Sequence, residues 1–150
     1  MDELYQKAMM RHAGNAVRAG RLDAPDGTVT LDNPMCGDRI TIDVRVDDAG
    51  RITDLAQHAR ACVLCQASAS IIGAHALGAD RNEIDRARAE VDAMLKQDGP
   101  TPAGEWADLD VFRPAIPHRS RHTCVTLPFD ALHQALAAAQ AAVPAPSDAD

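Results

Sequence analysis

A strict alternation of apolar and polar side chains over residues 39–46 constrains the fold more than any other feature. Its apolar members are Ile40, Ile42, Val44 and Val46, which would share one face of a β-strand. The turn sequence at 47–50 predicts a hairpin into a second strand over 51–60. A shorter alternating stretch at 28–31 ends in the turn sequence at 32–34. Together these segments predict a small antiparallel sheet with one solvent-facing side.

Helical patterns flank this sheet on both sides in the sequence. Apolar residues recur at helical spacing over 2–19, 62–77, 80–97 and 127–143, and Asp80 is placed to cap the third segment. Residues 99–118 are rich in Pro and Gly, which predicts a long loop with at most one short turn at 105–109. The predicted fold class is α+β, a small three-stranded antiparallel sheet with helices packed on one face.

The composition favours one domain over residues 1–143, followed by a flexible acidic tail at 144–150. An apolar content of 46% is enough for a core, and the net charge of -7 argues against nucleic acid and against an anionic membrane surface. The sequence contains no run of about 20 apolar residues and no secretory signal pattern. We therefore expect a cytoplasmic protein with reduced cysteines and with neither nucleic acid nor a membrane as its partner.

The four cysteines all lie beside a predicted turn or helix start. They are Cys36, Cys62, Cys65 and Cys124. Cys36 and Cys62 flank the predicted hairpin, and an antiparallel excursion returns to the end where it began. Cys36, Asp38 and Cys62 should therefore lie close together, with Gly37 allowing an unusual backbone angle between the first two. A helix N-terminus at Cys62 should lower the pKa of its thiol.

Three interpretations of these thiols stay open on spacing alone. They could bind a metal, because zinc takes about four N, O or S ligands and iron–sulfur clusters favour thiolates. Cys62 and Cys65 could instead form a redox pair, or the cysteines could be small buried apolar residues. A zinc ribbon would need a second close pair, and a thioredoxin-type pair would need a βαβ unit. The sequence fits neither of these two arrangements.

Three motifs, in this order, resemble the IscU/SufU/NifU N-terminal family of iron–sulfur cluster assembly scaffolds. They are Asn33–Asp38, Cys62–Ser70 and Cys124–Leu132. The long separation of the second and third motifs, and the lack of a Leu-Pro-Pro-Val-Lys segment, make the chain most similar to the SufU-like branch. Cys65 stands where that family usually has Ser, and Thr123 where it tends to have Lys or His.

The resemblance implies a SufE/NifU-like fold with a metal site of three cysteines and one aspartate. Cys36, Asp38, Cys62 and Cys124 would hold Zn²⁺ or a [2Fe-2S] cluster, with Cys65 and His122 as alternative ligands. The implied partners are a pyridoxal-phosphate cysteine desulfurase (SufS-like) and downstream iron–sulfur assembly proteins.

The implied activity is to accept persulfide sulfur, to scaffold a nascent cluster, or both; the first would make the protein a zinc-dependent sulfurtransferase. Cys36 matches the acceptor of the SufU-like branch, and Cys124 matches that of IscU-type proteins. The rival interpretation is a non-catalytic zinc-binding structural or interaction protein. Asp38 argues against it, because purely structural zinc sites are mostly closed by Cys and His.

Overall fold

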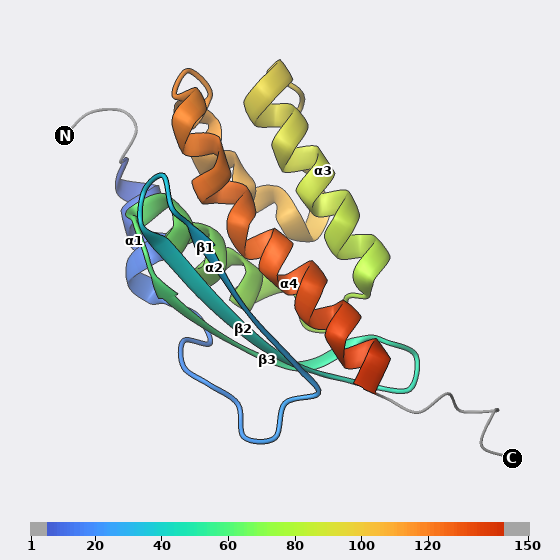
Figure 1. Ribbon diagram of the computed structural model, residues 1–150. Coiled ribbons are helices and arrows are strands. Elements are labelled where there is room, and N and C mark those ends of the chain that lie inside the picture. The colour runs from blue at the N-terminus through green and yellow to red at the C-terminus, as the bar shows by residue number, and fades with distance from the viewer. Residues whose placement is uncertain (1–5, 143–150) are drawn as a thin grey trace, which may run out of the picture.

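The computed structural model describes residues 6–142 (Figure 1). The elements, in chain order, are α1 (Lys7–Asn15), β1 (Gly27–Asn33), β2 (Asp38–Val46), β3 (Ile52–Arg60), α2 (Val63–His75), α3 (Arg81–Gln97), the 3₁₀ helices η2 (Gly104–Ala115) and η3 (Arg119–Arg121), and α4 (His122–Ala142). The predicted tail at 144–150 and the first residues of the predicted opening helix lie outside the described part of the chain.

The three strands form an antiparallel sheet in the order β1-β2-β3. Ile40, Ile42 and Val44 of β2 are fully buried beneath the helices, as their alternation predicts. Helix α4 packs on β1 and β2, while α2 packs on β3. Figure 1 shows the helices gathered on one side of the sheet, so the predicted α+β fold class is confirmed.

The opposite side of the sheet is less exposed to solvent than its polar pattern predicts. Asp43 points to this side, yet its side chain is completely buried. Its carboxylate accepts hydrogen bonds from Arg21 Nε at 2.6 Å, the Leu22 backbone N–H at 3.1 Å and Thr28 Oγ1 at 2.6 Å. The expectation of an open polar face is therefore wrong here, because the connection from α1 to β1 crosses the sheet. Alternation reports which side a residue faces, and it does not report what covers that side.

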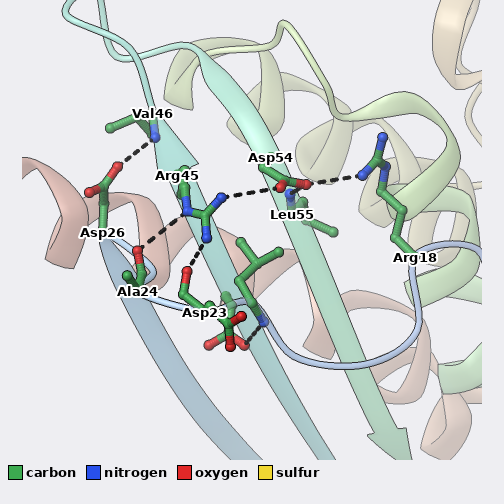
Figure 2. A network of polar contacts seen from close by, with 10 residues as sticks. Arg18, Asp23, Ala24, Asp26, Arg45, Val46, Asp54 and Leu55 are labelled. Atoms are coloured by element: carbon green, nitrogen blue, oxygen red, sulfur yellow. Dashed lines mark hydrogen bonds and ion pairs between the residues drawn. The ribbon is translucent and has the colours of Figure 1, made fainter.

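A network of polar contacts fastens this connection to β2 and β3 (Figure 2). The Arg45 guanidinium donates to the backbone carbonyls of residues 23 and 24 and lies 3.5 Å from the Asp54 carboxylate. Asp54 also pairs with Arg18 at 3.1 Å. Asp26 accepts a hydrogen bond of 2.9 Å from the backbone of β2. These contacts explain how a connection without regular structure holds its course across the sheet.

The helices approach one another closely through small residues. The Ala-Ser-Ala-Ser run of α2 is buried, and Ser68 Oγ donates to the Val125 carbonyl of α4 at 2.6 Å. At Gly73 of the same helix, a Cβ atom would lie only 2.3 Å from the Val17 carbonyl oxygen. The predicted cap of α3 is confirmed, since Asp80 accepts a hydrogen bond of 3.0 Å from the Glu83 backbone N–H.

Three predicted boundaries are wrong. Helix α1 ends at Asn15 instead of near residue 19, because Ala16 adopts a left-handed conformation with φ of 44°. The predicted loop at 99–118 contains the twelve-residue η2, in which every third side chain is buried: Trp106, Leu109, Phe112 and Ala115. A spacing of three matches the 3₁₀ period, so both aromatic side chains pin this segment to the core.

Helix α4 begins at His122 rather than at Leu127 and contains Pro128. Proline has no N–H to donate to the carbonyl four residues earlier, which is that of Cys124. The first turn of this helix, which carries the last cysteine, therefore lies outside the range predicted from the sequence. Across residues 6–142, no helix is both long enough and apolar enough to cross a membrane.

Candidate metal centre

The turn between β1 and β2 presents the first cysteine. Gly37 has a φ of 73°, and its backbone N–H donates to the Asn33 carbonyl at 2.8 Å. The Asn33 side chain accepts from the Met35 backbone N–H at 3.1 Å and donates to Thr123 Oγ1 at 3.0 Å. Asn33 thus ties the turn both to itself and to the first turn of α4. The role of Asn33 was not predicted, although an Asn directly before Pro is the sequence signal for such a turn.

The Asp38 carboxylate lies at the centre of the site. Asp38 is the first residue of β2 and is 1% exposed. Its Oδ1 accepts the Cys62 backbone N–H at 2.9 Å, while its Oδ2 lies 3.2 Å from Cys36 Sγ and 3.5 Å from Cys62 Sγ. The predicted proximity of Cys36, Asp38 and Cys62 is therefore present in the structure, and one side chain joins the hairpin to the start of α2.

The fourth predicted residue enters the site from the far end of the chain. Cys124 is fully buried in the first turn of α4, and its Sγ lies 3.3 Å from Cys36 Sγ. Ligand atoms of Cys36, Asp38 and Cys124 all lie within 4.8 Å of one another. Cys62 lies beside this group without belonging to it, with its Sγ 3.5 Å from Asp38 Oδ2. The structure thus groups the ligand atoms of Cys36, Asp38 and Cys124 and places the Cys62 thiol next to Asp38.

The two alternative ligands lie in different surroundings. Cys65 is fully buried in the hydrophobic core, and burial raises the pKa of its thiol. The Nε2 atom of His122 lies 3.0 Å from the carbonyl oxygens of Ala115 and Ile116. Its ring therefore closes the end of η2, and neither residue belongs to the group of mutually close ligand atoms found in the described part of the chain.

The thiols of the cluster differ in acidity. A hydrogen bond from Cys124 lowers the pKa of Cys62 to about 7 against the opposing effect of burial, and the backbone N–H of Cys65 in the first turn of α2 adds to the lowering. The pKa of Cys62 is thus shifted in the predicted direction, with the helix start as the smaller cause. The pKa of Cys36 is raised, mainly by burial, and that of Cys124 is raised mainly by its hydrogen bond with Cys62.

This donor set fits a small thiophilic cation. Three sulfur atoms and one carboxylate oxygen match the number and type of ligands that tetrahedral Zn²⁺ accepts, and thiolates with one substitution also suit iron–sulfur clusters. The donors come from three segments that are distant in the sequence. Bringing them together buries Asp38 among thiols, so the arrangement is better explained by metal binding than by packing alone.

Comparison with known proteins places the chain in a family. The family described as "NifU-like N terminal domain" matches residues 4–142, and the chain belongs to it. Among curated relatives, the iron-sulfur cluster assembly scaffold protein IscU of Streptococcus pyogenes serotype M1 is 28% identical over 91% of this chain and 84% of its own. The zinc-dependent sulfurtransferase SufU of Bacillus subtilis is 25% identical over 91% of this chain and 92% of its own.

A solved structure of the same family has the same fold. It is the N-terminal part of a nitrogen-fixing NifU-like protein from Brucella abortus, with 35% sequence identity and a TM-score of 0.88. The alignment covers 93% of this chain and 96% of that one. The elements that present the four site residues are thus part of a shared architecture.

Proposed function

We propose that this protein is an iron–sulfur cluster assembly protein with a metal site at Cys36, Asp38, Cys62 and Cys124. The site would hold Zn²⁺ or a [2Fe-2S] cluster. The observation that carries the proposal is the convergence of ligand atoms from the β1–β2 turn and the first turn of α4 within 4.8 Å. Relatives named as a cluster scaffold and as a zinc-dependent sulfurtransferase support both occupants.

Each residue of the site has a distinct task in this proposal. Bound metal would keep the thiols deprotonated, since thiolates are the ligand form. Asp38 is oriented by the Cys62 backbone N–H through Oδ1, which leaves Oδ2 directed at the two thiols. A carboxylate ligand exchanges more readily than a thiolate, so Asp38 suits a site that must open during function.

We further propose that Cys36 accepts sulfur from a pyridoxal-phosphate cysteine desulfurase. Cys36 is exposed in a turn, whereas Cys124 is fully buried and Cys62 is fixed at a helix start. Its thiolate would attack the outer sulfur of the desulfurase persulfide. The sulfur–sulfur bond of that persulfide breaks, the desulfurase cysteine leaves as a thiolate, and Cys36 carries the new persulfide. Downstream iron–sulfur assembly proteins would then receive the sulfur or the cluster, in a cytoplasm that keeps thiols reduced.

Peptide mass spectrometry after incubation with the desulfurase and cysteine, followed by alkylation, tests this assignment. We expect the extra sulfur on Cys36, no stimulation of the desulfurase by Cys36→Ser, and near wild-type stimulation by the matched Cys65→Ser variant. Persulfide on Cys124 would favour an IscU-like relay. If no cysteine carries sulfur while the desulfurase turns over normally, a structural zinc protein becomes the better description.

Metal analysis combined with the visible spectrum separates the two occupants. Protein purified without added metal should contain enough metal to fill one site per chain. Colourless protein with stoichiometric zinc indicates a sulfur relay, and brown protein with iron and acid-labile sulfide indicates a scaffold.

A further inference from the structure

Two arginines face each other on the outer side of the sheet, next to the metal centre. Arg39 follows Asp38 in β2, Arg60 ends β3, and the two are direct cross-strand partners. Both side chains are exposed, that of Arg39 by 58%. Like charges directly opposite each other destabilise a sheet. Sheet stability therefore does not explain why both positions carry arginine.

Only one of these charges is balanced within the described chain. Arg39 Nε lies 2.7 Å from the Asp32 carboxylate on β1. Arg60 takes part in none of the ion pairs formed among residues 6–142. An open hollow of about 410 Å³ is lined by Asp32, Gly37, Arg39 and Arg60. The Arg60 guanidinium, which has no ion-pair partner among residues 6–142, thus lies beside a hollow that reaches the turn carrying Cys36.

The same turn exposes a large apolar side chain. Met35 precedes Cys36 and is 89% exposed, more than any other large apolar residue in the described part of the chain. Arginine and methionine are both enriched in protein–protein interfaces, while isolated solvent-exposed methionine contributes nothing to the core. The positive charge of the two arginines is a local feature, because the chain as a whole carries a net charge of -7.

We propose that Met35, Arg39 and Arg60 form a docking surface for an acidic patch on the sulfur donor. This inference rests on the proposed function, in which the donor must bring its persulfide to Cys36. Any protein that reaches Cys36 also covers the neighbouring turn and the adjacent ends of β2 and β3. Guanidinium groups bind carboxylates through paired hydrogen bonds, so Arg60 selects a donor with Asp or Glu at this place.

The charge reversal Arg60→Glu tests the proposal, with Arg51→Glu as the matched control. Arg51 is also exposed and outside the ion pairs of the described chain, and it directly precedes β3, about 30 Å from Arg60 at the usual rise per residue. The affinity for the cysteine desulfurase of the same organism would be measured by calorimetry at low and physiological salt. We expect Arg60→Glu to weaken binding by about tenfold or more and to flatten its salt dependence.

The Arg51→Glu control should bind within about twofold of the wild type, because long-range effects of one charge are screened. A Met35→Ser variant, compared with Met10→Ser on α1, tests the apolar part and should weaken binding without changing its salt dependence. Metal content and circular dichroism of each variant check that the centre and the fold are intact.

The outcomes separate this inference from the proposed function. If wild type binds and stimulates the desulfurase while Arg60→Glu behaves identically, the docking surface is wrong and the function stands. If Arg60→Glu and Arg51→Glu lose the same affinity for the desulfurase, the effect comes from net charge alone, and the proposed docking surface is also wrong. If the wild type neither binds nor stimulates the desulfurase, both fail together.

Discussion

At the scale of single residues, the Asp38 carboxylate connects the parts of the centre. One oxygen is fixed by the Cys62 backbone N–H, and the other lies against the Cys36 and Cys62 thiols. Asp38 is thereby a ligand candidate and also the link between the hairpin and α2. Replacing Asp38 should therefore remove a ligand and also loosen the contact between the hairpin and α2.

Single Ala substitutions of Cys36, Asp38, Cys62 and Cys124 should each sharply lower the metal bound per chain, because each removes one of four donors. The measurement is elemental analysis of purified variants by mass spectrometry. Cys65→Ser and His133→Ala serve as controls and should retain the wild-type metal content. Full occupancy in Cys124→Ala would remove Cys124 from the site and make Cys65 or His122 its replacement.

Three of the four residues of this centre were predictable from local sequence. The return of a hairpin to its origin places Cys36, Asp38 and Cys62 together, and that inference needs no homologue. Cys124 was assigned to the site only through the resemblance, because no local sequence pattern indicates that α4 packs next to the β1–β2 turn. The contact of Asn33 with Thr123 and the use of His122 to close η2 depend on that same packing. Neither could be foreseen from local patterns.

At the scale of elements, the close packing of α2 against the segment that follows α1 depends on a glycine, Gly73. Gly73→Ala should destabilise the protein by about 1–3 kcal/mol, because its Cβ atom would meet the Val17 carbonyl oxygen and force α2 to shift. Chemical denaturation measures the change. Gly14→Ala on α1 is the control: its Cβ has no neighbour within 4 Å, so it should be neutral or stabilising by up to about 1 kcal/mol. Equal effects at both positions would contradict this account of the packing.

The buried carboxylate of Asp43 should make stability depend on acid pH. Burial alone would raise its pKa, but hydrogen bonds from Arg21, Thr28 and the Leu22 backbone together lower it. A lowered folded pKa adds stability that is complete above the unfolded value of about 3.9 and is lost as the pH falls through the folded value.

Asp43→Asn should therefore cost about 1–3 kcal/mol at neutral pH through the lost charged hydrogen bonds. The difference from wild type should shrink as the pH falls below the unfolded value. Urea unfolding at a series of pH values measures it, with the exposed Asp48→Asn as the control. A difference that stays constant down to the lowest pH would show that the carboxylate does not act through its charge.

The strands were easier to predict than the later helices. Period-two alternation and turn residues fixed β2 and β3 nearly to the residue, since both signals are local. The 3₁₀ helix η2 was hidden because its proline and glycine content is typical of loops, although Trp106, Leu109 and Phe112 recur every three residues. The start of α4 was hidden because Pro128 lies within the helix, where proline usually marks a boundary.

At the scale of the whole molecule, a bound metal would join the sheet to helices α2 and α4. The β1–β2 turn, the start of α2 and the first turn of α4 are linked at the site residues and by the Asn33–Thr123 contact. A ligand that binds only the folded state stabilises it by mass action. Metal binding should therefore be coupled to global stability as well as to chemistry.

Removing the metal with a chelator should lower the melting temperature by several degrees or more, as followed by circular dichroism. The Cys124→Ala variant, which should lack the site, should show little further change with chelator. An unchanged melting curve after proven removal of the metal would mean that the hydrophobic core holds the fold unaided.

X-ray absorption spectroscopy of the metal-loaded protein tests the central claim most directly, because it counts the ligand atoms themselves. For zinc, we predict three sulfur neighbours at about 2.3 Å and one oxygen neighbour at about 2.0–2.2 Å, with the oxygen contribution altered in Asp38→Ala. A shell of four sulfurs that Cys65→Ser reduces to three would place Cys65 in the centre in place of Asp38 and contradict the account.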